Sequence, residues 1–329
     1  MTATFYTIIA LVAFATNSLL CRMALMEGAI DPWNFTILRL LSGAICLGII
    51  ITLHTHRLKH QTQTVTYFNS DSNTGNNNAA VAAILADKGS WLSSVSLVVY
   101  ALCFSLAYVD LDAGTGALIL SAAVQLTMIG WSIYQKEQLT VLQWLALACA
   151  LIGFVYLMLP SAAIPSFTGA LTMALSGIAW GIYSIRGKAC LSPLRATGFN
   201  FIRSLVAIPF LLIVAISHWA GISMQGVVLA VISGAITSGL GYCMWYVAMP
   251  LLKSTQAAVV QLCVPIIAAL GGVLFLSETP SLRFIIASIV ILGAVLVFIL
   301  NKKNSVNKKP NIAQSLNRSG LSKSRKRQK

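Results

Sequence analysis

Residues 14–39 read FATNSLLCRMALMEGAIDPWNFTILR, and residues 180–203 read WGIYSIRGKACLSPLRATGFNFIR. The two segments align as two blocks of matches that differ slightly in spacing. The matched pairs are Ser18 with Ser184, Leu25 with Leu191, Phe35 with Phe199, Arg39 with Arg203 and, just beyond, Leu41 with Leu205. Later in each half, a glutamate opens a short stretch between apolar runs, Glu137-Gln138-Leu139-Thr140 and Glu278-Thr279-Pro280-Ser281. The matches predict two copies of one structural unit.

Long apolar runs surround both segments. The chain has 329 residues, of which 57% are hydrophobic and 9% are charged, and its mean hydropathy is +0.83. An ordinary soluble domain carries about 25% charged residues, so this composition excludes a soluble globular enzyme. A membrane-spanning helix needs about 20 mainly apolar residues. The runs that meet this need are 4–25, 34–53, 92–110, 113–134, 140–159, 167–186, 196–217, 225–248, 254–276 and 281–300. They predict an all-α polytopic membrane protein with ten transmembrane helices.

The repeat divides these runs into two groups of five. Because five is odd, the second group enters the membrane from the opposite side, and the two five-helix repeats are inverted, as in many secondary transporters. We expect the first repeat over residues 1–160 and the second over 161–300. A polar loop at 54–90, rich in Asn and Ser, cannot bury a core and is predicted to be mobile. Residues 301–329 are expected to form a basic, disordered tail.

The positive charge predicts orientation. The net charge is +14, and ten of the 22 Lys and Arg residues lie in 301–329. That tail has no aromatic residue for base stacking, so it indicates no nucleic-acid partner. If both termini are cytoplasmic, the connections on the outer side hold no Lys or Arg, although they hold Glu27, Asp31, Asp112 and Glu278. The basic residues of the connections all fall on the inner side, as the positive-inside rule requires. We therefore expect an integral protein of the plasma membrane, the inner membrane of a bacterium, with both termini in the cytoplasm.

The pattern resembles the EamA-type transporters of the drug/metabolite transporter superfamily over about residues 5–300. The resemblance rests on Trp180-Gly181-Ile182-Tyr183 and its weaker partner Phe14-Ala15-Thr16-Asn17, on Arg39 and Arg203 in the second helix of each repeat, on Glu137 and Glu278, and on Val264-Pro265. It implies a carrier for small metabolites, usually an exporter of amino acids or related compounds. It also implies a central cavity lined by the first, third and fourth helices of each repeat.

Polar side chains inside spans are costly and commonly mark a transport pathway; the competing explanation is interhelical hydrogen bonding. The cavity that the resemblance implies favours seven of them as substrate-binding residues. They are Asn17, Gln125, Trp180, Tyr183, Tyr242, Tyr246 and Gln261.

A second group is predicted to be gating or structural. Arg39 and Arg203 could bind a substrate carboxylate, but their places near helix ends favour snorkelling to the headgroups or pairing with a backbone carbonyl. Glu137 and Glu278 lie at tight connections, which favours helix capping and structural pairing over proton relay. Pro265 lies inside a predicted span and is expected to bend it.

A search of the sequence for catalytic motifs does not indicate an enzyme. The sequence contains no P-loop, GxSxG or HExxH motif, and it predicts neither a metal site nor a cofactor. A membrane-embedded enzyme or a lipid-handling protein at the interface stays as the alternative. The expected partners are a small-molecule substrate and the lipid bilayer, and a monomer and a homodimer both remain open.

Overall fold

The computed structural model describes residues 2–26, 28–68, 82–134, 140–158, 166–187, 190–217, 222–251, 260–261 and 263–301. Within these residues all regular structure is helical. The first half contains α1 (Thr2–Met26), α2 (Pro32–Phe68), α4 (Trp91–Ala107), α5 (Ala113–Tyr134) and α6 (Val141–Met158). The second half begins with α7 (Phe167–Gly187) and ends with α13 (Cys263–Leu276) and α14 (Leu282–Leu300).

Two rods between α7 and α13 are built from several short helices. The first joins α8 (Pro193–Ser204), the 3-10 turn η1 (Leu205–Ala207) and α9 (Ile208–Ala215). The second joins α10 (Met224–Ile232), the π-helix η3 (Ser233–Leu240), α11 (Gly241–Ala248) and the 3-10 turn η4 (Met249–Leu251). Pro209 is in the first turn of α9. Because the proline ring clashes with the preceding turn of a regular α-helix, the chain adopts 3-10 geometry just before it.

Each predicted apolar run contains a helix. Six helical segments are long and apolar enough to cross a membrane, namely Thr4–Met26, Pro32–His56, Ala113–Trp131, Phe167–Gly187, Pro193–Ala215 and Met224–Ala248. Four shorter apolar helices accompany them: Trp91–Ala107, Val141–Ala150, Cys263–Leu276 and Leu282–Ala294. The prediction of an all-helical membrane protein is confirmed by these lengths and compositions.

Two boundaries differ from those expected. Helix α2 continues to Phe68, well past the predicted end at residue 53, because its polar residues do not break a helix that is already formed. The mobility of 54–90 stays a prediction. Pro265 lies in α13, and residues 260–261, just before that helix, are helical too. The bend predicted there would involve residues 252–259 and 262, which lie outside the described residues.

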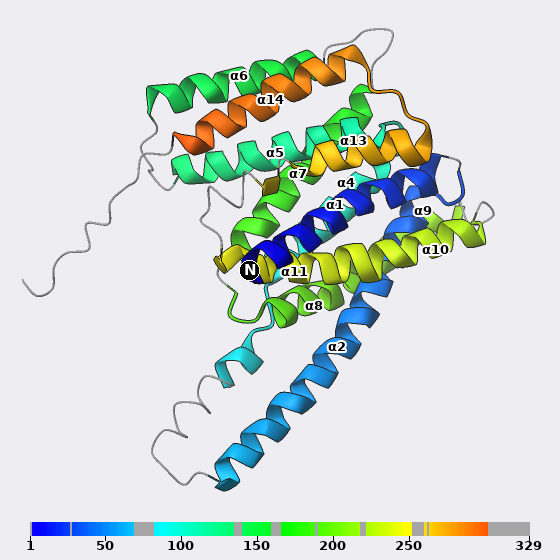
Figure 1. The fold of residues 1–329 in the computed structure, drawn as a ribbon. Coiled ribbons are helices and arrows are strands. Elements are labelled where there is room, and N and C mark those ends of the chain that lie inside the picture. Colours follow the sequence, from blue (N-terminus) through cyan, green and yellow to red (C-terminus); the bar gives the residue numbers. More distant parts are fainter. Residues whose placement is uncertain are drawn as a thin grey trace, which may run out of the picture.

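The helices pack in a pattern that relates the two halves. Helices α4 and α5 pack against α7, whereas α10, η3, α11 and α13 pack against α1. The first helix of each half is thus covered by the third and fourth rods of the other half. Helices α6 and α14 pack on each other and lie side by side at one edge of the bundle (Figure 1).

Small residues allow these close approaches. On α7, a Cβ built on Gly177 would lie 2.6 Å from Ala123 Cβ, and one built on Gly181 would lie 2.8 Å from Thr127 Cβ. Both distances are below van der Waals contact, so α7 can pack this closely against α5 only because these positions are glycine.

Candidate functional site

Arg39 is buried at the centre of the bundle although its charge is permanent. It lies about two turns into α2, and its side chain is entirely inaccessible. Its Nε donates to Ser238 Oγ at 2.9 Å, and its Nη2 donates to the hydroxyls of Tyr100 at 3.0 Å and Tyr242 at 2.7 Å. The guanidinium carbon also lies 5.1 Å from the ring centre of Tyr100 and 5.0 Å from that of Phe104. Hydroxyl groups and ring faces therefore take the place of water around the charge.

Tyr100 joins the two halves of the chain. Its hydroxyl oxygen accepts hydrogen bonds from Arg39, from Tyr242 at 2.9 Å and from Asn17 Nδ2 at 3.3 Å. The donors come from α2, α11 and α1, and Tyr100 itself stands on α4. Helices α1, α2 and α4 of the first half thus meet α11 of the second half at one oxygen atom.

Asn17 connects this oxygen to the π-helix η3. Its Oδ1 accepts from Ser233 at 2.7 Å, from Thr237 at 3.0 Å and from Ser238 at 3.4 Å. Single π-turns in otherwise α-helical rods are frequent at functional sites, and here the π-helix presents three hydroxyls to one amide. We name as the central cluster the residues Asn17, Arg39, Tyr100, Ser233, Thr237, Ser238 and Tyr242, all of which are buried.

Aromatic rings extend the central cluster toward one end of the bundle. Trp180 lies 4.5 Å from Tyr242 between ring centres, and it stacks on Tyr183 at 5.4 Å. Tyr183 in turn stacks on Tyr246 at 5.2 Å. Phe14 packs edge-on against Trp180 at 5.5 Å and Tyr242 at 5.9 Å. The rings form a continuous line from the central cluster to Tyr246.

Tyr246 lines a pocket of about 160 Å³ at that end. The other lining residues are Asp87, Gly89, Ser90, Ser93, Arg186, Gly187, Cys190, Ala196 and Asn200. The Asp87 carboxylate accepts from the amides of Leu191 at 2.7 Å and Ser192 at 2.8 Å, which holds the α7–α8 connection against the start of α4. The pocket is therefore polar and has a defined rim, and the ring line separates it from the central cluster.

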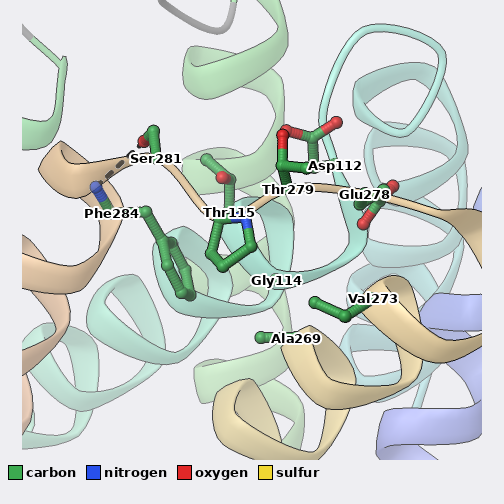
Figure 2. Close-up of a pocket in the computed structure, with 10 residues that line it drawn as sticks. Asp112, Gly114, Thr115, Ala269, Val273, Glu278, Thr279, Ser281 and Phe284 are labelled. Carbon is green, nitrogen blue, oxygen red and sulfur yellow. Dashed lines mark hydrogen bonds between the residues drawn. The ribbon is translucent and has the colours of Figure 1, made fainter.

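The opposite end of the bundle is closed by charges. Glu278 lies between α13 and α14, and its carboxylate accepts from the Ala113 amide at 3.1 and 2.9 Å and from Arg22 Nε at 3.3 Å. Arg22 also approaches Asp112 at 3.6 Å. Figure 2 shows Asp112 and Glu278 beside each other at the start of α5.

Burial raises the pKa of Glu278 above its ordinary value. The Ala113 amide and Arg22 act in the opposite direction, while the neighbouring Asp112 charge adds to the rise.

The predicted substrate-binding residues fall into two groups. Asn17, Trp180, Tyr183, Tyr242 and Tyr246 come together in the central cluster and the ring line. Gln125 lies in α5 and Gln261 lies shortly before α13; both are buried, but the contacts that define the central cluster include neither. Tyr100 and the three hydroxyls of η3 were not among the predicted site residues. These residues lie on the third helix of each half, which is expected to line the cavity. A polar residue on such a helix is the signal by which the sequence could have identified them.

The structure corrects one prediction about Arg39 and Arg203, the two arginines that the repeat matches. Snorkelling is wrong for Arg39, because its side chain faces the bundle interior, where hydroxyls solvate it. Arg203 Nη1 donates to the Lys88 carbonyl oxygen at 2.5 Å, and the guanidinium lies over the Trp91 ring at 5.5 Å; its gating or structural role stays a prediction. Glu278 accepts from the Ala113 amide and pairs with Arg22, and Glu137 lies outside the described residues; the gating or structural role of both stays a prediction.

Comparisons with known proteins agree with this architecture. The EamA-like transporter family matches residues 167–300. An uncharacterized protein of Pseudomonas aeruginosa is 42% identical over 289 residues, which are 88% of this chain and 91% of the relative. An uncharacterized transporter of Archaeoglobus fulgidus is 26% identical over 231 residues, covering 66% of this chain and 82% of the relative.

A solved crystal structure has a similar fold. Its TM-score is 0.56 at 17% identity, over 92% of this chain and 99% of the solved one. At this identity the likeness concerns the fold alone, while the family match and the relatives concern the kind of protein. The chain belongs to the EamA-like transporter family of the drug/metabolite transporters, and it is an integral, multi-pass membrane transporter.

Proposed function

We propose that the chain is a secondary carrier that exports small metabolites, amino acids or related compounds, by alternating access between two inverted five-helix repeats. The carrying observation is the central cluster, a buried polar site whose residues come from both halves of the chain. Ionisable side chains at membrane depth are rare, and those that occur mark substrate or ion pathways.

The packing pattern supports the alternating-access part of the proposal. Helices α4 and α5 cover α7, and α10, η3, α11 and α13 cover α1, so an exchange of the two halves reproduces the pattern. Two halves of similar packing can exchange conformations, giving inward-open and outward-open states of similar energy. The polar pocket beside Asp87 and the ionic contacts of Glu278 then lie at the two ends of the pathway.

We further propose that the protein lies in the bacterial inner membrane with both termini in the cytoplasm. This orientation places the pocket beside Asp87 on the cytoplasmic side, where an exporter must receive its substrate. Gln125 and Gln261 belong to the pathway as amides on the fourth helix of each repeat. The hydroxyls and amides of the central cluster offer no paired acid and base, which favours the carrier over the alternative of a membrane enzyme.

Efflux from proteoliposomes tests the proposal. Vesicles that contain the purified protein are loaded with a panel of radiolabelled amino acids and their derivatives, and loss of each solute is followed over time. We expect at least one solute to leave faster than from protein-free vesicles, and we expect Asn17→Ala to slow its loss. A panel in which no solute moves, with the protein shown to be folded and inserted, would contradict a carrier function.

A further inference from the structure

Arg39 carries a charge that no described carboxylate neutralises. The chain contains eight Asp and Glu residues, and those that the structure describes all lie in connections between helices, none inside one. The ion pairs among the described residues all involve Arg22. A buried cation without a counter-ion is unfavourable, so its presence at the centre of the bundle needs a reason other than stability.

Hydrogen-bond donors also exceed acceptors around this charge. Arg39 Nη1 is buried and has no hydrogen-bond partner among the described residues. Three donors converge on the Tyr100 hydroxyl oxygen, which has two lone pairs. Three more converge on Asn17 Oδ1. A group that brings acceptor oxygens and a negative charge would correct both imbalances at once.

The matching arginine of the second half shows what a structural role looks like in this chain. Arg203 donates to the Lys88 carbonyl and covers the Trp91 ring at the bundle edge. Its side chain is partly exposed, so its charge is not sealed inside the bundle. Among the described residues Arg39 has no main-chain acceptor, and its side chain has no accessible face. This difference separates the two residues.

We propose that Arg39 binds the carboxylate of the transported metabolite, an inference that rests on the carrier function proposed above. The guanidinium fork presents Nη1, whose two N–H groups have no partner among the described residues, to the carboxylate oxygens. The hydroxyls of Tyr100 and Tyr242, which accept from Nη2, turn their hydrogens toward the same group. The remainder of the substrate lies against the rings of Phe14 and Trp180, which pack against Tyr242. The substrate class is therefore a small carboxylate-bearing metabolite with an apolar body, and amines that lack a carboxylate are not carried.

Matched solutes in the same proteoliposomes test this assignment. One set is L-phenylalanine, 3-phenylpropanoate and phenethylamine; the other is L-leucine, isovalerate and isoamylamine. We expect movement of solutes with a carboxylate and none of either amine. Arg39→Gln should slow carboxylate transport by at least about tenfold, as expected for loss of hydrogen bonds to a charged group, and Arg39→Lys, which keeps the charge without the fork, should fall between. Arg203→Gln is the matched control and should leave the preference for carboxylates unchanged.

Thermal unfolding in detergent shows that each variant is folded and separates binding from structure. Because Arg39 has no counter-ion, Arg39→Gln should unfold at a temperature no lower than the unmodified protein. Addition of 3-phenylpropanoate should raise the unfolding temperature of the unmodified protein and of Arg203→Gln, but not that of Arg39→Gln. Transport of amines as fast as of carboxylates, or an unchanged carboxylate preference in Arg39→Gln, would overturn the assignment while leaving the carrier function intact. If the unmodified protein moves no solute of any kind, both proposals fail together.

Discussion

Arg22 Nε lies 3.3 Å from Glu278 Oε1, and the contact ties α1 to the connection between α13 and α14. The Glu278 side chain is 11% exposed, and so is that of Arg22. Arg22 also donates to the carbonyl oxygens of Tyr108 at 3.0 Å and Val109 at 2.8 Å. One guanidinium on α1 thus holds together two connections, α4–α5 and α13–α14, at the same end of the bundle, so polar contacts help to close this end.

The raised pKa of Glu278 gives this end a pH dependence. Because the pKa is higher in the folded protein than the ordinary value of 4.5, the folded state holds the proton more tightly than the unfolded chain does. The free energy of unfolding from this group therefore increases as the pH falls from neutral through the folded pKa, and decreases as the pH rises. Glu278→Gln stays uncharged and should lack this component. We expect a smaller change in unfolding temperature between pH 7 and pH 5 for Glu278→Gln than for the unmodified protein; an identical pH profile would count against a raised pKa.

Gly177 is predicted to be essential for the packing of α7 on α5. A methyl group there would lie 2.6 Å from Ala123 Cβ and 2.7 Å from the Leu120 carbonyl oxygen, so Gly177→Ala should destabilise the fold by about 1–3 kcal/mol. The control is Gly48→Ala, because a Cβ at Gly48 meets nothing within 4 Å and alanine favours a helix. Unfolding temperatures in detergent compare the two variants, and equal stability of both would contradict the packing argument.

Removal of the Tyr242 hydroxyl should affect the central cluster without a change of shape. In Tyr242→Phe, Arg39 loses an acceptor at 2.7 Å and the Tyr100 oxygen loses a donor at 2.9 Å. Leaving a buried charged donor unsatisfied costs about 1–3 kcal/mol. We expect a lower unfolding temperature and slower efflux of whichever solute the carrier moves. Tyr134→Phe serves as the control because Tyr134 is 76% exposed, and a Tyr242→Phe variant that matches it in both measurements would refute the role of the hydroxyl.

Two serines that flank Glu278 should respond in opposite directions. Ser277 has a φ of 54°, a left-handed conformation that favours glycine at the end of a helix. Ser277→Gly should therefore stabilise the fold by up to about 1 kcal/mol. The Ser281 hydroxyl accepts from the Phe284 amide at 3.1 Å and caps α14, so Ser281→Ala should cost about 0.5–2 kcal/mol. Unfolding temperatures check both signs, and a loss of stability in Ser277→Gly would show that the serine side chain matters more than the backbone conformation.

The sequence predicts where the helices lie better than it predicts their local geometry and their ends. Apolar runs locate each rod because the bilayer requires a minimum length. Hydropathy does not report the π-helix of η3 or the extension of α2 to Phe68, since both depend on which backbone and side-chain contacts are available rather than on composition.

The candidate site shows the same division. Asn17 and Tyr242 are predictable because polar residues inside spans are few. The environment of Arg39 is not, because the repeat gives Arg39 and Arg203 the same position and only three-dimensional packing distinguishes them. Arg39 meets hydroxyls from α4, η3 and α11, whereas Arg203 meets the backbone before α4. A sequence repeat thus predicts matched positions, but not matched chemistry.

Cysteine labelling tests the proposed orientation. Thr279 and Lys88 are both exposed and lie at opposite ends of the bundle, Thr279 beside Glu278 and Lys88 before α4. With both termini in the cytoplasm, Thr279 faces the periplasm and Lys88 faces the cytoplasm. In intact spheroplasts, a membrane-impermeant maleimide should therefore label Thr279→Cys and leave Lys88→Cys unlabelled until the membrane is disrupted.

The unmodified protein supplies the background, since its seven native cysteines are present in both variants. Labelling of Lys88→Cys above this background in intact spheroplasts, with Thr279→Cys protected, would invert the orientation. The pocket beside Asp87 would then open to the periplasm, and the direction of transport would have to be argued from uptake rather than export.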